Sequence, residues 1–128
     1  MPGRFVIGLG PHLGISEADI EAAVVAALSR YGLDLGACRN LAVLDRRRAE
    51  QGLRAFAEHH ELRIEFFSSE QLDAVRSVPN PSPLVEALSG IWSVAEAAAL
   101  LSAGSGRLLV EKQKFPNVTV AVAEVPEG

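Results

Sequence analysis

The stretch from Phe5 to Ser16, FVIGLGPHLGIS, combines an apolar run with three glycines and a serine that precedes a helical pattern. A strand that ends in glycines just before a helix leaves backbone N–H groups without partners. It also faces the positive end of the helix dipole. Such a loop can hold an anion, whether a phosphate or a carboxylate. The glycines that we assign to this candidate anion-binding loop are Gly8, Gly10 and Gly14.

The spacing of these glycines departs from the dinucleotide-binding fingerprint G-x-G-x-x-G. Gly8 and Gly10 fit the pattern, but its third position is Leu13 and the next glycine comes one residue late. The acidic residue expected about 20 positions further on is also misplaced, since Asp34 follows the first predicted helix and not a second strand. The chain has no Walker lysine either. The sequence therefore disfavours a nucleotide as the ligand.

Several serines occur at positions typical of helix N-caps, namely Ser16, Ser68, Ser82 and Ser93. In a parallel α/β sheet, ligands bind beyond the carboxyl ends of the strands, where the helices that follow the strands begin. We therefore expect one cleft to be lined by Gly8, Gly10, Ser68, Ser82 and Ser93. Each serine taken alone is also explained as a cap with no further role.

Catalytic candidates are few, because the sequence contains no G-x-S-x-G motif and no paired carboxylates. Ser93 and Glu96 have the spacing of a capping box, which would make them a helix cap. As site residues, they would instead place a hydroxyl and a general base at the mouth of the cleft. His12 is the single histidine of the glycine loop and a further acid–base candidate. No His, Cys and acidic residues share metal-ligand spacing, so we expect no metal and no cofactor.

Asn80 lies between two prolines in the segment VPNPSP. Prolines stiffen such a segment and hold it extended. The amide of Asn80 either satisfies its own turn or faces the cleft and binds a ligand carboxylate.

Length, charge and composition limit the kinds of protein that this sequence could encode. The chain has 128 residues, enough for one domain with a core of its own, and we expect residues 1–128 to form a single domain. A net charge of −4 argues against nucleic acid as a partner. No apolar stretch is long enough to span a membrane, and a lone cysteine fits a reducing compartment. We therefore expect a cytoplasmic protein.

Apolar periodicity predicts five strands, over residues 4–9, 41–44, 62–66, 108–110 and 118–123. Helices are predicted behind Ser16, over 46–58, and behind Ser68, Ser82 and Ser93. The last of these is apolar on nearly all sides and should be the most buried. We predict an α/β fold, with a single three-layer domain, a mainly parallel sheet and a C-terminal antiparallel hairpin. The hairpin is expected to turn through a seven-residue loop, EKQKFPN.

Six segments together resemble the CobE family, which is also the C-terminal domain of the cobalamin-biosynthesis protein CbiG. They are GLGPHLGIS, LAVLDRRRAEQGL, FFSSEQLDAV, VPNPS, SVAEAAAL and KQKFPNVTVAVA, in this order from about Phe5 to Ala123. The resemblance implies a role in cobalamin biosynthesis. CbiG opens the ring-A δ-lactone of a cobalt-precorrin and releases acetaldehyde. Because CbiG carries a preceding domain, this chain resembles the stand-alone CobE form of the aerobic pathway.

The family commonly shows the pattern A-T-x-D-x-K-x-x-E after its second strand. Here these positions are Ala42, Val43, Asp45, Arg47 and Glu50. The resemblance implies that Asp45, Arg47 and Glu50 are ligand-binding residues. Arg47 keeps the positive charge and could clamp a carboxylate, but an arginine could hardly act as a base. Precorrins carry many acetate and propionate groups, so the resemblance favours a carboxylate as the anion. The cations expected to attract it are Arg46, Arg47, Lys112 and Lys114.

Three hypotheses about function follow. The leading one is an accessory or carrier protein that binds a precorrin or another corrinoid intermediate. Another is a hydrolase that acts on a precorrin lactone, as CbiG does. The last is an interaction module without a ligand, which docks on another pathway enzyme through the strand at 118–123, taken as an edge strand.

Overall fold

The computed structural model of the chain describes residues 4–76, 93–104 and 107–126, with the side chains of residues 75 and 76 left out. The strands are β1 (Phe5–Pro11), β2 (Cys38–Leu44), β3 (Arg63–Phe67), β4 (Leu108–Phe115) and β5 (Val118–Glu124). The helices are α1 (Glu17–Arg30), α2 (Gln51–His59), α3 (Ser69–Arg76) and α5 (Val94–Ala103). Two 3-10 turns, η1 (Leu35–Ala37) and η2 (Asp45–Arg47), precede β2 and α2. The helix predicted behind Ser82 and the predictions for Asn80 lie outside the described residues.

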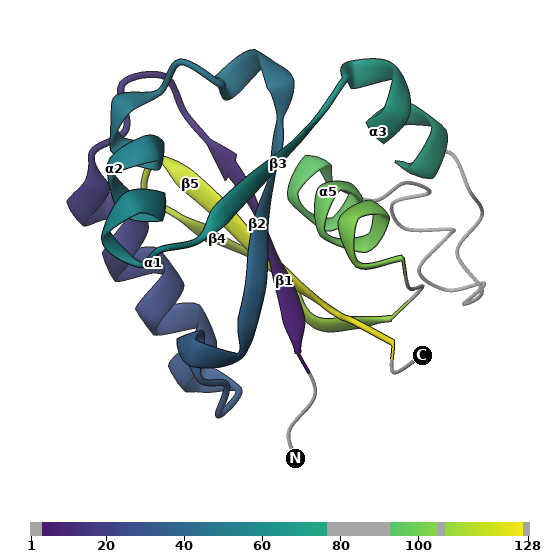
Figure 1. Cartoon of the computed structure of the whole chain (residues 1–128), viewed down its shortest axis with the longest axis horizontal. Helices are drawn as coiled ribbons and strands as arrows, with labels where there is room; N and C mark the ends of the chain where they lie inside the picture. The colour runs from purple at the N-terminus through teal and green to yellow at the C-terminus, as the bar shows by residue number, and fades with distance from the viewer. Residues whose placement is uncertain (1–3, 77–92, 105–106, 127–128) are drawn as a thin grey trace.

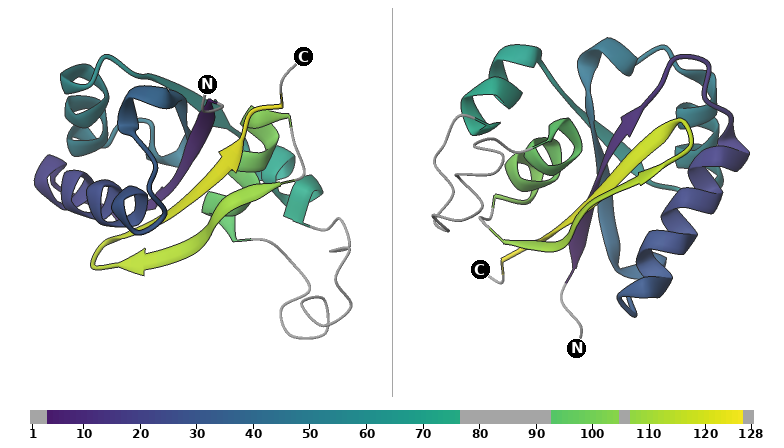
Figure 2. Two further views of the ribbon diagram at one scale, coloured as in Figure 1. Left: turned by 90° about the horizontal axis from the view of Figure 1, so that it is seen from below. Right: turned by 180° about the vertical axis from the view of Figure 1, so that it is seen from behind.

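The strands form one sheet in the order β3-β2-β1-β5-β4. β1, β2 and β3 run parallel, and β5 is antiparallel to both of its neighbours, β1 and β4. Helices α1 and α2 cover one face of the sheet, and α3 and α5 cover the other (Figures 1 and 2). This arrangement confirms the predicted three-layer α/β fold with a C-terminal antiparallel hairpin. Among the described helices, none is long and apolar enough to cross a membrane.

Alternation along β1 divides the core into two apolar layers. Phe5, Ile7 and Leu9 belong to the layer shared with α1 and α2. Val6 belongs to the layer shared with α5, which the structure builds mainly from alanines. Helix α5 buries seven of its ten residues, as its apolar sequence predicts.

Gly8 allows α5 to lie directly against β1. A Cβ atom at Gly8 would lie 2.0 Å from the carbonyl oxygen of Ala95 and 2.9 Å from the Cβ of Ala99. Any side chain at this position would force the helix away from the sheet. Gly8 is therefore a packing glycine, buried beneath α5.

The C-terminal hairpin is tighter than the sequence suggests. β4 continues to Phe115, and Phe115 pairs directly with Val118, so the turn consists of Pro116 and Asn117 alone. Proline presets the first turn position, and Asn117 adopts a φ of 69°, which asparagine tolerates. The predicted seven-residue loop is wrong because its polar residues form an edge strand, where side chains face solvent.

Two further expectations need correction. The helix predicted over residues 46–58 begins only at Gln51, because η2 occupies the first positions and Ala49 is exposed. The strand at 118–123 is not an edge strand: β5 lies between β1 and β4, and both of its sides are hydrogen-bonded. It offers no open edge for a partner, and the docking site assigned to it is therefore wrong.

Candidate functional site

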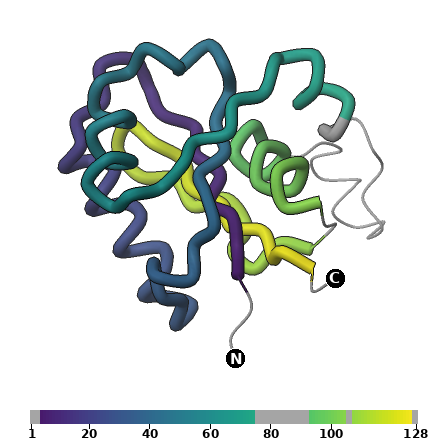
Figure 3. Tube along the Cα trace, in the orientation of Figure 1, coloured from purple at the N-terminus to yellow at the C-terminus, as the bar shows by residue number. Residues whose placement is uncertain are grey.

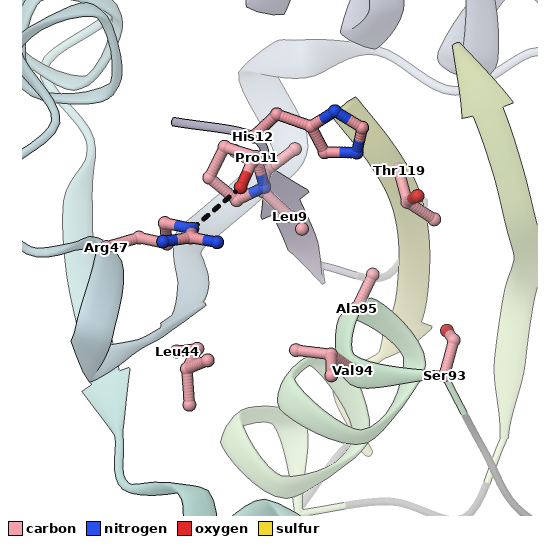
Figure 4. A pocket seen from close by; sticks show the side chains of 10 residues that line it. Leu9, Pro11, His12, Leu44, Arg47, Ser93, Val94, Ala95 and Thr119 are labelled. Carbon is pink, nitrogen blue, oxygen red and sulfur yellow. Dashed lines mark hydrogen bonds between the residues drawn. The ribbon is translucent and has the colours of Figure 1, made fainter. Parts of the chain in front are cut away.

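A pocket of about 240 Å³ lies at the carboxyl ends of β1 and β2, next to the N-terminus of α5 (Figure 4). This is the position at which α/β sheets bind ligands. Backbone and apolar side chains make most of its wall, and a few polar groups surround it, a composition typical of small-molecule sites. The residues that line it are Leu9, Gly10, Pro11, His12, Leu44, Arg47, Ser93, Val94, Ala95 and Thr119.

Four segments distant in the sequence build this pocket. The end of β1 and the loop after it supply Gly10 and His12, and the connection from β2 to α2 supplies Arg47. The first turn of α5 supplies Ser93 and its neighbours. Thr119 comes from β5, where it pairs with Gly10 across the strands. The sheet order and the packing of α5 therefore bring the site together.

Arg47 is the cationic side chain of the pocket. Its Nε donates a hydrogen bond of 2.9 Å to the carbonyl oxygen of Pro11, and its side chain is partly buried. Figure 4 shows the guanidinium beside Pro11 at one side of the pocket, with Ser93 and Val94 at the other. One of its five N–H donors makes this bond, so the guanidinium has further donors with which to bind an anion.

The N-terminus of α5 is fixed by a complete capping box. The Ser93 hydroxyl accepts from the Glu96 amide at 3.1 Å, and Glu96 Oε1 accepts from the Ser93 amide at 2.9 Å. This confirms the cap that the spacing predicts. The N–H groups of Val94 and Ala95 belong to the first turn and have no acceptor within the helix. Both residues line the pocket, so the positive end of the helix dipole lies beside it.

Glu96 makes a second bond that the sequence does not suggest. Its Oε2 accepts from the backbone amide of Lys112 at 3.2 Å, which ties α5 to the edge strand β4. The residue is only 6% exposed and does not line the pocket. Both carboxylate oxygens thus accept backbone N–H bonds, an arrangement suited to structure and poorly suited to a general base.

The residues of the family pattern around 45–50 hold the glycine loop. Arg47 binds the loop at Pro11, and Glu50 Oε1 accepts from the amide of Gly14 at 2.9 Å. The two connections that follow β1 and β2 lie side by side at one end of the molecule (Figure 3). Asp45 faces elsewhere and pairs with Arg48 at 2.6 Å.

The other candidate residues are spread over the molecule. Gly10 and Ser93 share the pocket, whereas Gly8 is buried under α5. Ser68 caps α3 in a capping box with Gln71 and does not line the pocket. Gly14, Arg46, Lys112 and Lys114 are exposed, and none of them lines the pocket. Ser82 and Asn80 lie outside the described residues.

Sequence reasoning missed Thr119 and the apolar wall. Thr119 reaches the pocket only because β5 pairs antiparallel with β1, a long-range contact without a local signal in the sequence. The sequence predicts Leu44 at the end of a buried strand, and it predicts Val94 and Ala95 as ordinary residues of an apolar helix. The arrangement of the elements in space makes these residues part of a site.

The cysteine and the two histidines at the end of α2 lie away from the pocket. Cys38 is buried, and loss of hydration raises the pKa of its thiol to about 11, so it is protonated at neutral pH. His59 and His60 bind Glu17 and Glu21 of α1, at 3.3 and 2.7 Å. Within the described part of the chain, no group of three or more His, Cys, Asp or Glu could hold a metal ion.

A wider depression lies between α2 and β3, with Arg54, Glu58 and Phe66 among its lining residues. It has a volume of about 480 Å³ and opens broadly to solvent. It receives neither a helix N-terminus nor the glycine loop, and opposite charges from Arg54 and Glu58 share its wall. The pocket beside Arg47 is the better candidate for an anionic ligand.

Fold and pocket define an α/β domain with a pocket at the carboxyl ends of its parallel strands. Residues 5–123 match the model of the family described as Cobalamin synthesis G C-terminus, and the chain belongs to this family. It is therefore a cobalamin biosynthesis protein with the CobE/CbiG C-terminal domain.

Two curated relatives of the chain differ in length. Over 120 residues the chain is 35% identical to Protein CobE of a Sinorhizobium species, covering 92% of this chain and 78% of that protein. Over 125 residues it is 30% identical to Cobalt-precorrin-5A hydrolase of Priestia megaterium. That match covers 98% of this chain but 33% of the hydrolase, so the chain spans about a third of that relative.

Solved structures show the same fold. The crystal structure of CobE, a protein from the cobalamin biosynthetic pathway, superposes with a TM-score of 0.80 at 31% identity and covers 98% of this chain and 93% of that one. The cobalamin biosynthesis protein chiG from Agrobacterium tumefaciens gives a TM-score of 0.77 at 32% identity, with 96% and 99% covered.

Proposed function

We propose that the chain binds a carboxylate-bearing corrinoid intermediate at the pocket beside Arg47 and acts as an accessory or carrier protein of cobalamin biosynthesis. The observation that carries the proposal is the pairing of two positive groups across one apolar-walled pocket. Arg47 lies at one side and the N-terminus of α5 at the other.

Carboxylates match both groups. A guanidinium can donate two parallel N–H bonds to one carboxylate, and the first turn of a helix favours negative charge. Hydroxyl groups of Ser93 and Thr119 add neutral donors beside them. The net charge of −4 opposes binding at long range. Salt screens that repulsion beyond roughly 10 Å, so local charges decide the attraction.

Pocket size limits how much of the ligand is enclosed. A volume of about 240 Å³ is below the roughly 300–1,000 Å³ of pockets that enclose a drug-sized ligand, and a corrinoid macrocycle is larger still. The pocket fits one edge of the ring with one or two of its carboxylate side chains. A protein that binds its ligand by an edge can present the rest to an enzyme, which suits a carrier.

Hydrolysis of a precorrin lactone is the alternative suggested by the hydrolase relative. The carboxylate nominated as its base, Glu96, is occupied by two backbone N–H bonds and does not line the pocket. Binding is therefore the function that the geometry supports better.

The experiment is an absorbance titration with hydrogenobyrinic acid, a corrinoid that carries many carboxylates. Two variants remove the same charge: Arg47→Gln in the pocket, and Arg48→Gln at a side chain that pairs with Asp45 and lies 4.4 Å from the centre of the Phe66 ring. A charged hydrogen bond is worth about 1.5–3 kcal/mol, so Arg47→Gln should raise Kd roughly 10- to 100-fold. Arg48→Gln should change Kd less than about twofold. Absence of saturable binding by the unaltered chain, or equal effects of the two changes, would overturn the proposal.

A further inference from the structure

Leu13 is an apolar side chain held in solvent. It is 76% exposed, more than any other large apolar side chain of the described residues. It lies in the loop between β1 and α1, directly after His12, which lines the pocket. An exposed leucine alone needs no explanation, since single apolar side chains on surfaces are common. The backbone around Leu13 gives the reason to ask further.

Hydrogen bonds fix this loop on both sides of Leu13. Ahead of it, the amide of His12 donates to the carbonyl oxygen of Asn117 at 2.8 Å, and Arg47 holds Pro11. Behind it, Gly14 adopts a φ of 76° and donates to Glu50 Oε1 at 2.9 Å. Ile15 then enters the core and is only 5% exposed. The loop thus presents Leu13 from a braced backbone, with little freedom left to lose on binding.

We propose that Leu13 is an apolar contact for the ring face of the corrinoid macrocycle. This inference rests on the proposed function. Carboxylates lie at the periphery of such a ring, whereas the faces of the ring are largely apolar. When an edge of the ring enters the pocket, the remainder extends past Gly10, Pro11 and His12, and Leu13 is the next residue of that loop.

Glu50 acts here as a positioning residue. Its carboxylate fixes Gly14, and through it the orientation of Leu13, without lining the pocket. It is also the N-cap of α2, but its side chain makes no capping bond there. Removing the carboxylate therefore loosens the loop without removing a side-chain cap from the helix.

The main test compares Leu13→Ser with Val25→Ser, a matched change at an exposed apolar residue in the middle of α1 that does not line the pocket (49% exposed). Titration with hydrogenobyrinic acid should show Kd raised about tenfold by Leu13→Ser, as expected for one leucine face covered on binding. Val25→Ser should leave Kd within twofold. Because Leu13 is exposed, Leu13→Ser should leave the melting temperature nearly unchanged. Leu13→Ala serves as a second variant.

Glu50 is tested by its two substitutions and by a double variant. Glu50→Gln keeps an oxygen acceptor for Gly14 and should bind nearly as well as the unaltered chain. Glu50→Ala should weaken binding several-fold, and adding Leu13→Ser should give no more than the loss from Leu13→Ser alone. If the losses of affinity from Glu50→Ala and Leu13→Ser multiply in full in the double variant, Glu50 does not act through Leu13, and its positioning role is overturned.

The outcomes separate this inference from the function on which it rests. If the unaltered chain binds the probe and Leu13→Ser binds equally well, the contact assigned to Leu13 is wrong and the proposed function stands. If the unaltered chain does not bind the probe, the proposed function is wrong, and the contact assigned to Leu13 is overturned with it.

Discussion

Gly8 and Gly10 offer a matched pair of substitutions that separates packing from binding. Both residues belong to β1, and strand alternation places both on the face that carries α5. At Gly8 an added methyl would meet the backbone of α5. At Gly10 the nearest atom to an added Cβ is the Cβ of Thr119 at 3.7 Å, an ordinary contact distance. The same substitution should therefore destabilise the fold at Gly8 and occupy part of the pocket at Gly10.

The cost of Gly8→Ala follows from the separation of 2.0 Å between the added Cβ and the Ala95 carbonyl oxygen. To restore an ordinary contact, α5 must retreat by roughly 1 Å or more. Such a shift loosens a layer whose alanines pack directly on the sheet. Overpacking costs typically 1–3 kcal/mol and occasionally more, and backbone atoms cannot rotate away. We expect a loss of about 3 kcal/mol or more, which lowers Tm by on the order of 10 °C.

Thermal and denaturant unfolding measure this loss, and the titration with hydrogenobyrinic acid measures binding. Gly10→Ala should change stability by less than about 1 kcal/mol, because its position has no positive φ and no close neighbour. Its methyl group should still weaken binding, because it occupies part of the pocket. Equal stability of Gly8→Ala and Gly10→Ala would refute the close packing of α5. Unchanged affinity of Gly10→Ala would refute the placement of the ligand.

Three further predictions concern residues outside the pocket. Glu96→Gln can still close the capping box, but its side-chain NH2 group cannot accept a hydrogen bond from the Lys112 amide. The free energy of unfolding should therefore fall by about 1–2 kcal/mol; unchanged stability in urea would contradict this bond. Burial raises the pKa of Cys38 from the ordinary thiol value of 9.0 to about 11, so above pH 9 the folded state holds a proton that the unfolded chain loses. Stability should therefore fall by about 2 kcal/mol as the pH rises from about 9 to about 11, and Cys38→Ala should flatten that slope; an equal slope in both proteins would count against it. His60→Ala should cost about 1 kcal/mol in denaturant unfolding, because it removes a bond to α1 and a ring contact, whereas His59→Ala, at a more exposed side chain, should cost little.

Local signals predicted the elements and their caps well. The two residues of a capping box form hydrogen bonds with each other and lie only three positions apart in the sequence. The caps at Ser68 and Ser93 were therefore predictable. The apolar run behind Ser93 likewise predicted a buried helix. Polar edge strands give a weaker signal, and residues 111–115 of β4 were therefore mistaken for a loop.

Interactions between distant segments could not be predicted from the sequence. Glu50 was expected to bind a ligand, and it holds Gly14, a residue 36 positions away. Gly8 was assigned to an anion-binding loop, and its missing side chain instead admits the backbone of α5. In both cases the residue type was informative, but the partner is decided by which elements pack side by side in the fold.

The most direct measurement is a nuclear magnetic resonance titration of the ¹⁵N-labelled chain with hydrogenobyrinic acid, followed at the backbone amides. If a corrinoid binds at the proposed site, saturable shifts should gather at Gly10, His12, Leu13, Ala95 and Thr119. The amides of the depression between α2 and β3, such as Arg54 and Phe66, should remain unshifted. Saturable shifts confined to that depression, or no saturable shifts at all, would contradict corrinoid binding at the pocket beside Arg47.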